Sequence, residues 1–485
     1  MTATDGNATR RFLAAIDRRR PEPVDWSAAP PRYKRYRDTT RTALPAAGRD
    51  AWKGDLLRGL LGLTRVSWTY PTDDAGQLAP GARRVQIGRP VASGGALYPI
   101  EAYLADGTAL HHYDTVHHAL ETVRDGDHRS TLLPQAANAD AALILTAVFW
   151  RNGFKYRDFA YRLQCQETGA LCAQALVLAD TLGLNATVHL DFDGEQAERI
   201  LDLDPAAEGA LAILTFKTAD APRNTTSEAP SDRDAAQPAN PSTPVTLLLP
   251  HLTELHAATR TQGPPPPPAP RRATTASEPA IALPQVTDAD LAEGIPHRAS
   301  PINGFRRSPL TTADLAQILA AARPGDRVTT DLYVLVWNVP GIPPGAYRYD
   351  RDRRTLTHHG PAAIEAGPLG PNTRHALRGA AAALVPVGAP LTETATCGDL
   401  AYRLQQAETG MVVHRATLAA AALGLTGRIH SDGTNLTTDA VLGLTAPRRS
   451  LSFLLIGHPH PSGPTLTRRP DRRVTTPGTH HHTKG

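Results

Sequence analysis

The sequence predicts an α+β protein in which two similar domains follow one another along the chain. An internal repeat carries this prediction: the motif AYRLQ-x2-ETG occupies residues 160–169 and returns at 401–410 as AYRLQ-x2-ETG. The offset between the copies stays constant through His189-x-Asp191 and His430-x-Asp432 and ends with Ile200-Leu201-x-Leu203 and Val441-Leu442-x-Leu444. A constant offset over this length is not expected by chance, so both copies should share one fold.

Each copy is predicted to form a long apolar helix, a glycine break, a short strand, a helix and a buried core strand. Uninterrupted apolar runs at residues 211–216 and 451–456 predict the two core strands. His189 and His430 fall at matching positions of the short strands, which favours a structural role for both. The repeated Arg162 and Arg403 are interpreted as scaffold residues for the same reason.

The predicted organisation has four parts. They are a first domain at residues 1–218, a Pro/Ala-rich linker at 219–294, a second domain at 295–462 and a flexible tail at 463–485. Five prolines that begin at Pro264 are typical of a polyproline II spacer. A short helix is predicted near residues 245–260, with Leu248, Leu252 and Leu255 on one face, and we expect it to dock onto a domain.

Composition and charge exclude several classes of function. The 485-residue chain is 41% hydrophobic and 20% charged, with a net charge of only +4, so nucleic-acid binding has little electrostatic support. No apolar run is long enough to span a bilayer, and we expect a cytoplasmic protein without membrane contact.

The cysteines Cys165, Cys172 and Cys397 show no metal-ligand spacing, so no metal site is predicted. Cys165 and Cys172 are expected to pack within one helix.

Two segments of the first domain point to chemistry. Ser93-Gly94-Gly95 opens the run SGGALYP, and its bare glycines let backbone amides lie against a flat ligand. Lys155-Tyr156 places two proton-handling side chains next to each other just before the repeated helix. Such a pair suits a reaction in which a proton leaves as a hydride leaves.

Spaced in this way, the two segments resemble the SagB-type azoline dehydrogenases of the FMN-dependent nitroreductase superfamily. The region from Tyr33 to Leu60 resembles the leading helices of those enzymes. The resemblance implies a nitroreductase-like fold with an antiparallel-rich sheet flanked by helices, FMN as the cofactor, and Lys155 and Tyr156 as the catalytic pair. Because nitroreductases are ordinarily homodimers with FMN at the subunit interface, the two copies are expected to form an intramolecular pseudo-dimer.

The second copy carries a different part of the expected site. Arg298-Ala299-Ser300 resembles the flavin-phosphate motif of nitroreductases, and a guanidinium with a hydroxyl suits a phosphate dianion. Arg473 near the C-terminus is a further candidate phosphate ligand, although a solvated tail is an almost equal alternative. The second copy lacks the Ser-Gly-Gly segment and has Thr396 and Cys397 where the first has Lys155 and Tyr156.

The first copy in turn has no Arg-x-Ser at the matching place, so the two losses are complementary. We therefore expect one composite site, in which Arg298 and Ser300 hold the FMN phosphate while Ser93, Gly94 and Gly95 lie against the ring system.

The resemblance implies oxidation of thiazoline or oxazoline rings to azoles in a ribosomally made precursor peptide or a related carrier-bound peptide, with dioxygen as final acceptor. Cyclodehydratase or other biosynthetic enzymes are expected partners. Two alternatives stay open: an NAD(P)H-dependent nitro or flavin reductase, and a non-catalytic flavoprotein scaffold of a biosynthetic complex. No G-x-G-x-x-G follows a predicted strand, which weakens the first alternative without excluding it.

Overall fold

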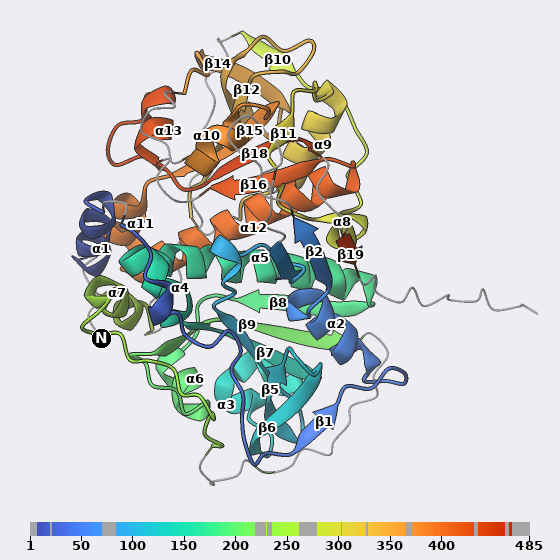
Figure 1. The fold of residues 1–485 in the computed structure, drawn as a ribbon, viewed down its shortest axis with the longest axis vertical. Coiled ribbons are helices and arrows are strands. Elements are labelled where there is room, and N and C mark those ends of the chain that lie inside the picture. The colour runs from blue at the N-terminus through green and yellow to red at the C-terminus, as the bar shows by residue number, and fades with distance from the viewer. Residues whose placement is uncertain are drawn as a thin grey trace, which may run out of the picture.

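The computed structural model places two antiparallel sheets on either side of a central pair of long helices (Figure 1). It describes residues 7–19, 22–69, 84–218, 229, 235–260, 279–301, 303–325, 328–364, 371–430, 435–460 and 465–467. The proline run, Arg473 and the rest of the expected C-terminal tail beyond residue 467 lie outside the described residues.

The first half of the chain forms an antiparallel sheet with strand order β1-β6-β5-β4-β7-β9-β8. Its strands are β1 (Arg41–Ala43), β4 (Ile100–Ala105), β5 (Ala109–Asp114), β6 (Ala119–Asp125), β7 (Ala141–Val148), β8 (Leu184–His189) and β9 (Glu208–Thr218). Its helices are α1 (Asn7–Asp17), α2 (Ala51–Leu61), α3 (Arg129–Leu132), α4 (Trp150–Tyr156), α5 (Ala160–Thr181) and α6 (Gly194–Ile200). β7 is buried along its whole length, as the central strand of a sheet covered on both faces should be.

The second half repeats this topology with the order β10-β14-β13-β12-β15-β18, and β16 pairs with β18 as β8 pairs with β9. Its strands are β10 (Ala280–Ala282), β11 (Phe305–Arg306), β12 (Asp331–Val336), β13 (Gly345–Asp350), β14 (Thr355–Gly360), β15 (Ala382–Gly388), β16 (Thr426–His430), β17 (Arg449–Ser450) and β18 (Phe453–Pro459). Its helices are α7 (Pro250–Arg260), α8 (Leu291–His297), α9 (Thr312–Ala321), α10 (Pro371–Leu377), α11 (Pro390–Cys397), α12 (Leu400–Ala422) and α13 (Asn435–Val441). The predicted α+β fold with two similar copies is therefore confirmed.

A small additional sheet joins the end of the described chain to the first half. It has the order β19-β2-β3 and consists of β19 (Thr465–Thr467), β2 (Arg65–Thr69) and β3 (Arg84–Gly88). The second copy has no counterpart among its described residues, because α9 leads to β12 through a much shorter connection than the one that joins α2 to β4.

The two halves meet along the buried helices α5 and α12, which lie side by side at the centre of the molecule (Figure 1). Arg162 of α5 donates to the carbonyl of Leu451 in the second half, and Arg403 of α12 donates to the carbonyl of Leu190 in the first at 2.8 Å. The scaffold role predicted for these two repeated arginines matches these contacts. Each satisfies backbone carbonyls of the opposite half in a buried interface.

The helices α1 and α7 are exchanged between the halves. The backbone N–H of Thr9 in α1 donates to Asp399 at 2.8 Å, just before α12, and that of Leu252 in α7 donates to Asp158 at 2.8 Å, just before α5. Asp158 and Asp399 are equivalent positions of the repeat. The helix that opens each copy thus contacts the other copy, so both halves contribute to one closed structure.

Three local predictions can be compared with the structure: the helix near residues 245–260, a helix at Tyr33 to Arg37, and the packing of two cysteines. The helix expected near residues 245–260 is α7, and Leu252 and Leu255 are fully buried, but Leu248 precedes the helix and is half exposed. Tyr33 to Arg37 form no helix, because buried Lys34 there pairs with Glu208 at 2.8 Å instead of continuing an apolar face. Cys165 and Cys172 are both buried in α5, as predicted.

Candidate functional site

The Ser-Gly-Gly segment forms a tight loop between β3 and β4. Gly94–Ala96 is a 3₁₀ turn in which Gly95 has φ +66°, and the following Ala96 has φ +55°. Two hydrogen bonds hold the loop: Ser93 Oγ accepts from the Tyr98 N–H at 2.8 Å, and the Gly94 N–H donates to Glu167 Oε1 at 2.8 Å. A left-handed backbone suits Gly95 and is strained at Ala96, so the loop conformation is imposed by its surroundings.

Lys155 and Tyr156, at the end of α4, lie directly beside this loop. A β-carbon at Gly95 would lie 2.9 Å from Lys155 Nζ and 3.0 Å from the Tyr156 hydroxyl. The Lys155 ammonium also lies 5.0 Å from the centre of the Tyr156 ring. The structure thus brings together the two segments of the first copy that the sequence singled out, although some sixty residues separate them.

A strained residue follows the Lys-Tyr pair. Arg157 follows the last residue of α4 with φ +54° and ψ −147°, a backbone conformation that residues other than glycine rarely adopt. At the equivalent position of the second copy, Gly398 takes nearly the same conformation, with φ 70° and ψ −175°. The first copy therefore keeps a glycine-like backbone without glycine directly after its candidate catalytic pair.

Arg298 reaches from the second copy to the base of the Ser-Gly-Gly loop. Its Nε donates to the Pro90 carbonyl, its side chain is buried, and Nη1 has no hydrogen-bond partner. Burial, together with the charge of nearby Arg65, lowers the pKa of Arg298 to about 10. Arg65 donates to the Arg298 carbonyl, and Arg428 donates to the carbonyl of Pro301 at 3.4 Å.

No carboxylate among the described residues forms an ion pair with Arg65, Arg298 or Arg428. Arg298 and Arg65 lie close enough for each charge to disfavour the other, and such a pair of guanidinium ions without a carboxylate partner suits an anion. Ser300 lies two residues after Arg298 and is exposed. The structure thus places Arg298 close to the loop of the other copy.

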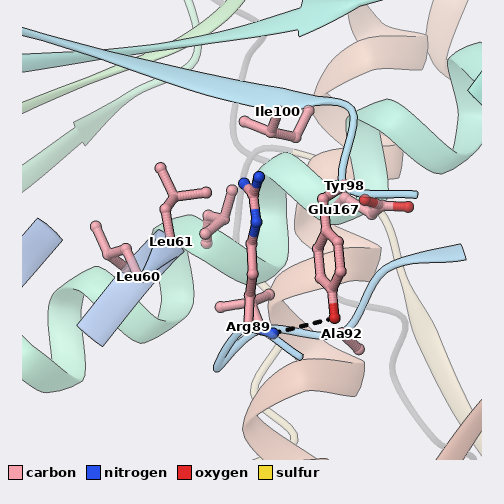
Figure 2. A pocket seen from close by; sticks show the side chains of 9 residues that line it. Leu60, Leu61, Arg89, Ala92, Tyr98, Ile100 and Glu167 are labelled. Atoms are coloured by element: carbon pink, nitrogen blue, oxygen red, sulfur yellow. Dashed lines mark hydrogen bonds between the residues drawn. The ribbon is translucent and has the colours of Figure 1, made fainter. Parts of the chain in front are cut away.

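A small cavity lies behind the loop, with a volume of about 10 Å³. It is lined by Leu60, Leu61, Arg89, Val91, Ala92, Tyr98, Ile100, Glu167 and Leu171. Figure 2 shows the Arg89 side chain standing between Leu61 and Tyr98, whose hydroxyl accepts from the Arg89 N–H at 3.1 Å. Arg89 is 2% exposed, and its Nε and Nη1 atoms have no hydrogen-bond partner within the described structure.

Two of these lining residues were missed by the sequence reasoning. Arg89 stands four positions before Ser93, but a lone arginine ahead of a glycine loop carries no signal of burial. Glu167 belongs to the repeated ETG motif, which served only to identify the repeat and was given no role in the site. Burial raises the pKa of Glu167 to about 8, in spite of the hydrogen bonds from Gly94 and Ser93. Its carboxyl is therefore mainly neutral near pH 7.

The side chains present fit FMN. Buried guanidinium nitrogens without a partner are costly, and a bound anionic or hydrogen-bond-accepting group would satisfy those of Arg89 and Arg298. Arg298 with Arg65 suits a phosphate, and the glycine loop leaves room for the close approach of a planar ring. In the part of the chain that the structure describes, no cluster of His, Cys, Asp and Glu could hold a metal ion, and no helix has the length and apolarity to cross a bilayer.

Comparison of the fold defines the class of protein. A putative nitroreductase from Anabaena variabilis superposes with a TM-score of 0.71 at 20% identity, over 93% of this chain and 99% of that chain. This chain therefore has the nitroreductase fold, in both of its halves. No family model matches the sequence.

Comparison with characterised proteins is more specific. The chain is 31% identical over 148 residues to the microcin B17-processing protein McbC of Escherichia coli, covering 27% of this chain and 54% of McbC. It is 28% identical over 160 residues to the trifolitoxin-processing protein TfxB of Rhizobium leguminosarum bv. trifolii, covering 30% and 42%. The matches span about half the length of these relatives. The chain is homologous to both, and the resemblance that the sequence motifs indicated is confirmed.

Proposed function

We propose that this protein is an FMN-dependent dehydrogenase that oxidises thiazoline or oxazoline rings of a precursor peptide to thiazoles or oxazoles. The observation that carries the proposal is that the Lys155 amine and the Tyr156 hydroxyl both lie against Gly95, at 2.9 and 3.0 Å from where a β-carbon would stand, in a loop approached by Arg298 of the other copy. Homology to two proteins named for processing peptide toxins supports the class of substrate. A nitroreductase fold supports an oxidoreductase that uses flavin.

The reaction removes two hydrogens from a five-membered ring, one as a hydride and one as a proton. When bound, FMN supplies the acceptor for the hydride, and dioxygen is the proposed final acceptor. The chain's own residues supply position and proton transfer. Arg298 and Arg65 would hold the phosphate, and Arg89 would satisfy an acceptor on the cofactor from inside the cavity.

Lys155 and Tyr156 would remove the proton from the substrate ring. Their polar atoms flank the same face of Gly95, so a ring carbon held against this loop is within reach of either. Burial of Glu167 behind the loop keeps its carboxyl neutral, so it anchors the Gly94 amide without placing a full negative charge beside the cofactor.

The direct test is turnover of a synthetic peptide that carries azoline rings. The FMN-loaded protein should remove two hydrogens per ring, seen by mass spectrometry. Lys155→Ala should keep bound FMN and lose activity by about a hundredfold or more, the scale of losing a positioned acid or base. Arg353→Ala, an exposed arginine in the β13–β14 hairpin, is the matched control and should retain full activity.

Two outcomes would contradict the proposal. A protein that holds FMN but leaves azoline peptides unchanged, while reducing nitro compounds with NAD(P)H, would instead be a reductase. A protein that binds no flavin at all would be a scaffold without flavin chemistry, and one that holds FMN but acts on neither substrate would be the non-catalytic flavoprotein scaffold. Normal turnover by Lys155→Ala with FMN bound would remove the catalytic assignment alone.

A further inference from the structure

An exposed tryptophan is held beside the candidate catalytic pair. Trp26 opens a 3₁₀ turn (Trp26–Ala28) and is 59% exposed. The turn is fixed at both ends: Asp25 Oδ1 accepts from the Ser27 N–H at 2.9 Å, and Trp150 Nε1 donates to the Ala28 carbonyl at 3.0 Å. The indole therefore stands in solvent on a rigid support.

The position of this indole relative to Lys155 is specific. The Lys155 ammonium lies 5.6 Å from the centre of a Trp26 ring. Phe154, the residue before Lys155, packs against the same indole with ring centres 5.7 Å apart and an interplanar angle of 68°. This edge-to-face contact restrains the plane of the Trp26 ring, while the exposure of the side chain leaves much of the indole open to another partner.

Trp26 also differs from the other exposed apolar side chains. Apart from Trp26, the large hydrophobic residues that are exposed in the described structure are all aliphatic. They are Val85, Ile87, Val116, Leu247, Leu248 and Leu466. An exposed indole next to a proton-transfer pair has a flat, polarisable surface of the kind that stacks on planar heterocycles.

We propose that Trp26 is a substrate-binding residue that stacks on a five-membered azoline or azole ring of the peptide and presents it to Lys155. This inference rests on the proposed function, since it takes its ring from the proposed substrate. The indole would confer preference for cyclised residues over the serine or cysteine residues from which such rings derive. It contributes to binding and not to proton transfer.

The test compares two peptides of one sequence, one with azole rings and one with the unmodified serine and cysteine residues. Their affinities are measured by fluorescence anisotropy of a labelled peptide on the full chain, with and without FMN. Wild-type protein should favour the azole peptide by about tenfold, the scale of one stacking contact. Trp26→Ala should lose this preference, and Trp26→Phe should retain most of it. Val116→Ala, in the distant β5–β6 turn, should bind as the wild type does.

Kinetics with an azoline peptide give a second measurement. Trp26→Ala should raise KM by about tenfold while kcat changes by less than about threefold, because stacking is lost but the proton-transfer pair is intact. Retention of the ring preference by Trp26→Ala would overturn the inference even if wild-type turnover is normal. Conversely, absence of wild-type turnover together with a Trp26-dependent ring preference would overturn the proposed reaction and leave the binding residue standing.

Discussion

Gly169 of α5 touches the backbone of Ala407 of α12 so closely that a β-carbon at position 169 would overlap the Ala407 carbonyl. The same relationship returns with the copies exchanged, since a β-carbon at Gly410 would overlap the carbonyl of Gln166. Gln166 and Ala407 are equivalent in the repeat, as are Gly169 and Gly410. The two contacts are therefore related by the internal pseudo-twofold symmetry, and they set the separation of the helices.

Substitution of either glycine should open this interface. Gly169→Ala or Gly410→Ala forces α5 and α12 apart, because backbone atoms on the facing helix cannot rotate away as a side chain can. We expect a loss of about 2–4 kcal/mol in the free energy of unfolding, measured by urea denaturation. Gly360→Ala is the control: its β-carbon would meet no atom within 4 Å, and stability should stay within about 0.5 kcal/mol of the wild type. Equal effects at all three positions would contradict a helix-contact role.

The repeat could be found from the sequence because both copies retain the helix motif, whose residues are buried in α5 and in α12. Arg89 and Glu167 could not be assigned, since the sequence does not show which arginine or glutamate loses its solvent. The exchange of α1 and α7 between the halves could not be predicted from the sequence either. Their sequences differ, and only the equivalent Asp158 and Asp399 to which they bond reveal the relationship.

The strain at Arg157 predicts an unusual gain in stability. Arg157→Gly places the residue type of Gly398 at the equivalent position and relieves a backbone conformation that costs about 1–3 kcal/mol. After subtraction of the entropy cost of glycine, the free energy of unfolding should rise by about 1 kcal/mol. Arg157→Ala removes the same charge near Glu22 but keeps the strain, so it should not stabilise. Equal stabilisation by both variants would assign the effect to charge.

Glu167 predicts a dependence of stability on pH. Its folded pKa of about 8 lies above its ordinary value of 4.5, so the unfolded state loses this proton at a lower pH than the folded state does. The contribution of Glu167 to stability is thus complete below about pH 4.5 and falls as the pH rises toward 8. Glu167→Gln lacks this fall but can still accept the Gly94 N–H. In the flavin-free protein, Glu167→Gln should gain a few kcal/mol relative to the wild type between about pH 4.5 and pH 8, measured by denaturant unfolding at each pH. A constant difference across this range would show that the carboxyl ionises normally.

The arginines of the second copy and of the loop should govern flavin affinity. Arg298→Ala should weaken FMN binding by roughly 10- to 100-fold, the scale of a lost charge-assisted contact, and Arg89→Ala should also weaken it. Recovery of flavin fluorescence on dilution gives the dissociation constant. Arg353→Ala, which changes the net charge equally at an exposed site, should leave the constant unchanged. An equal loss for Arg353→Ala and Arg298→Ala would show that overall charge, and not the Arg298 site, determines affinity.

The unequal halves predict one FMN per chain. In the second copy the short connection between α9 and β12 replaces the small sheet and the Ser-Gly-Gly loop, and a β-carbon at Gly325 within it would touch Glu408, the equivalent of Glu167. That copy also has Cys397 in place of Tyr156, and the first copy has no Arg-x-Ser at the place that matches Arg298 and Ser300. Flavin released by heat and measured against protein concentration should therefore give about one FMN per chain.

Because Arg298 and the loop come from different halves, residues 1–218 expressed alone should not retain FMN, and a bulky residue at Gly94 should expel it from the full chain. Two FMN per chain, or tight binding by residues 1–218 alone, would show that the site is not shared between the copies.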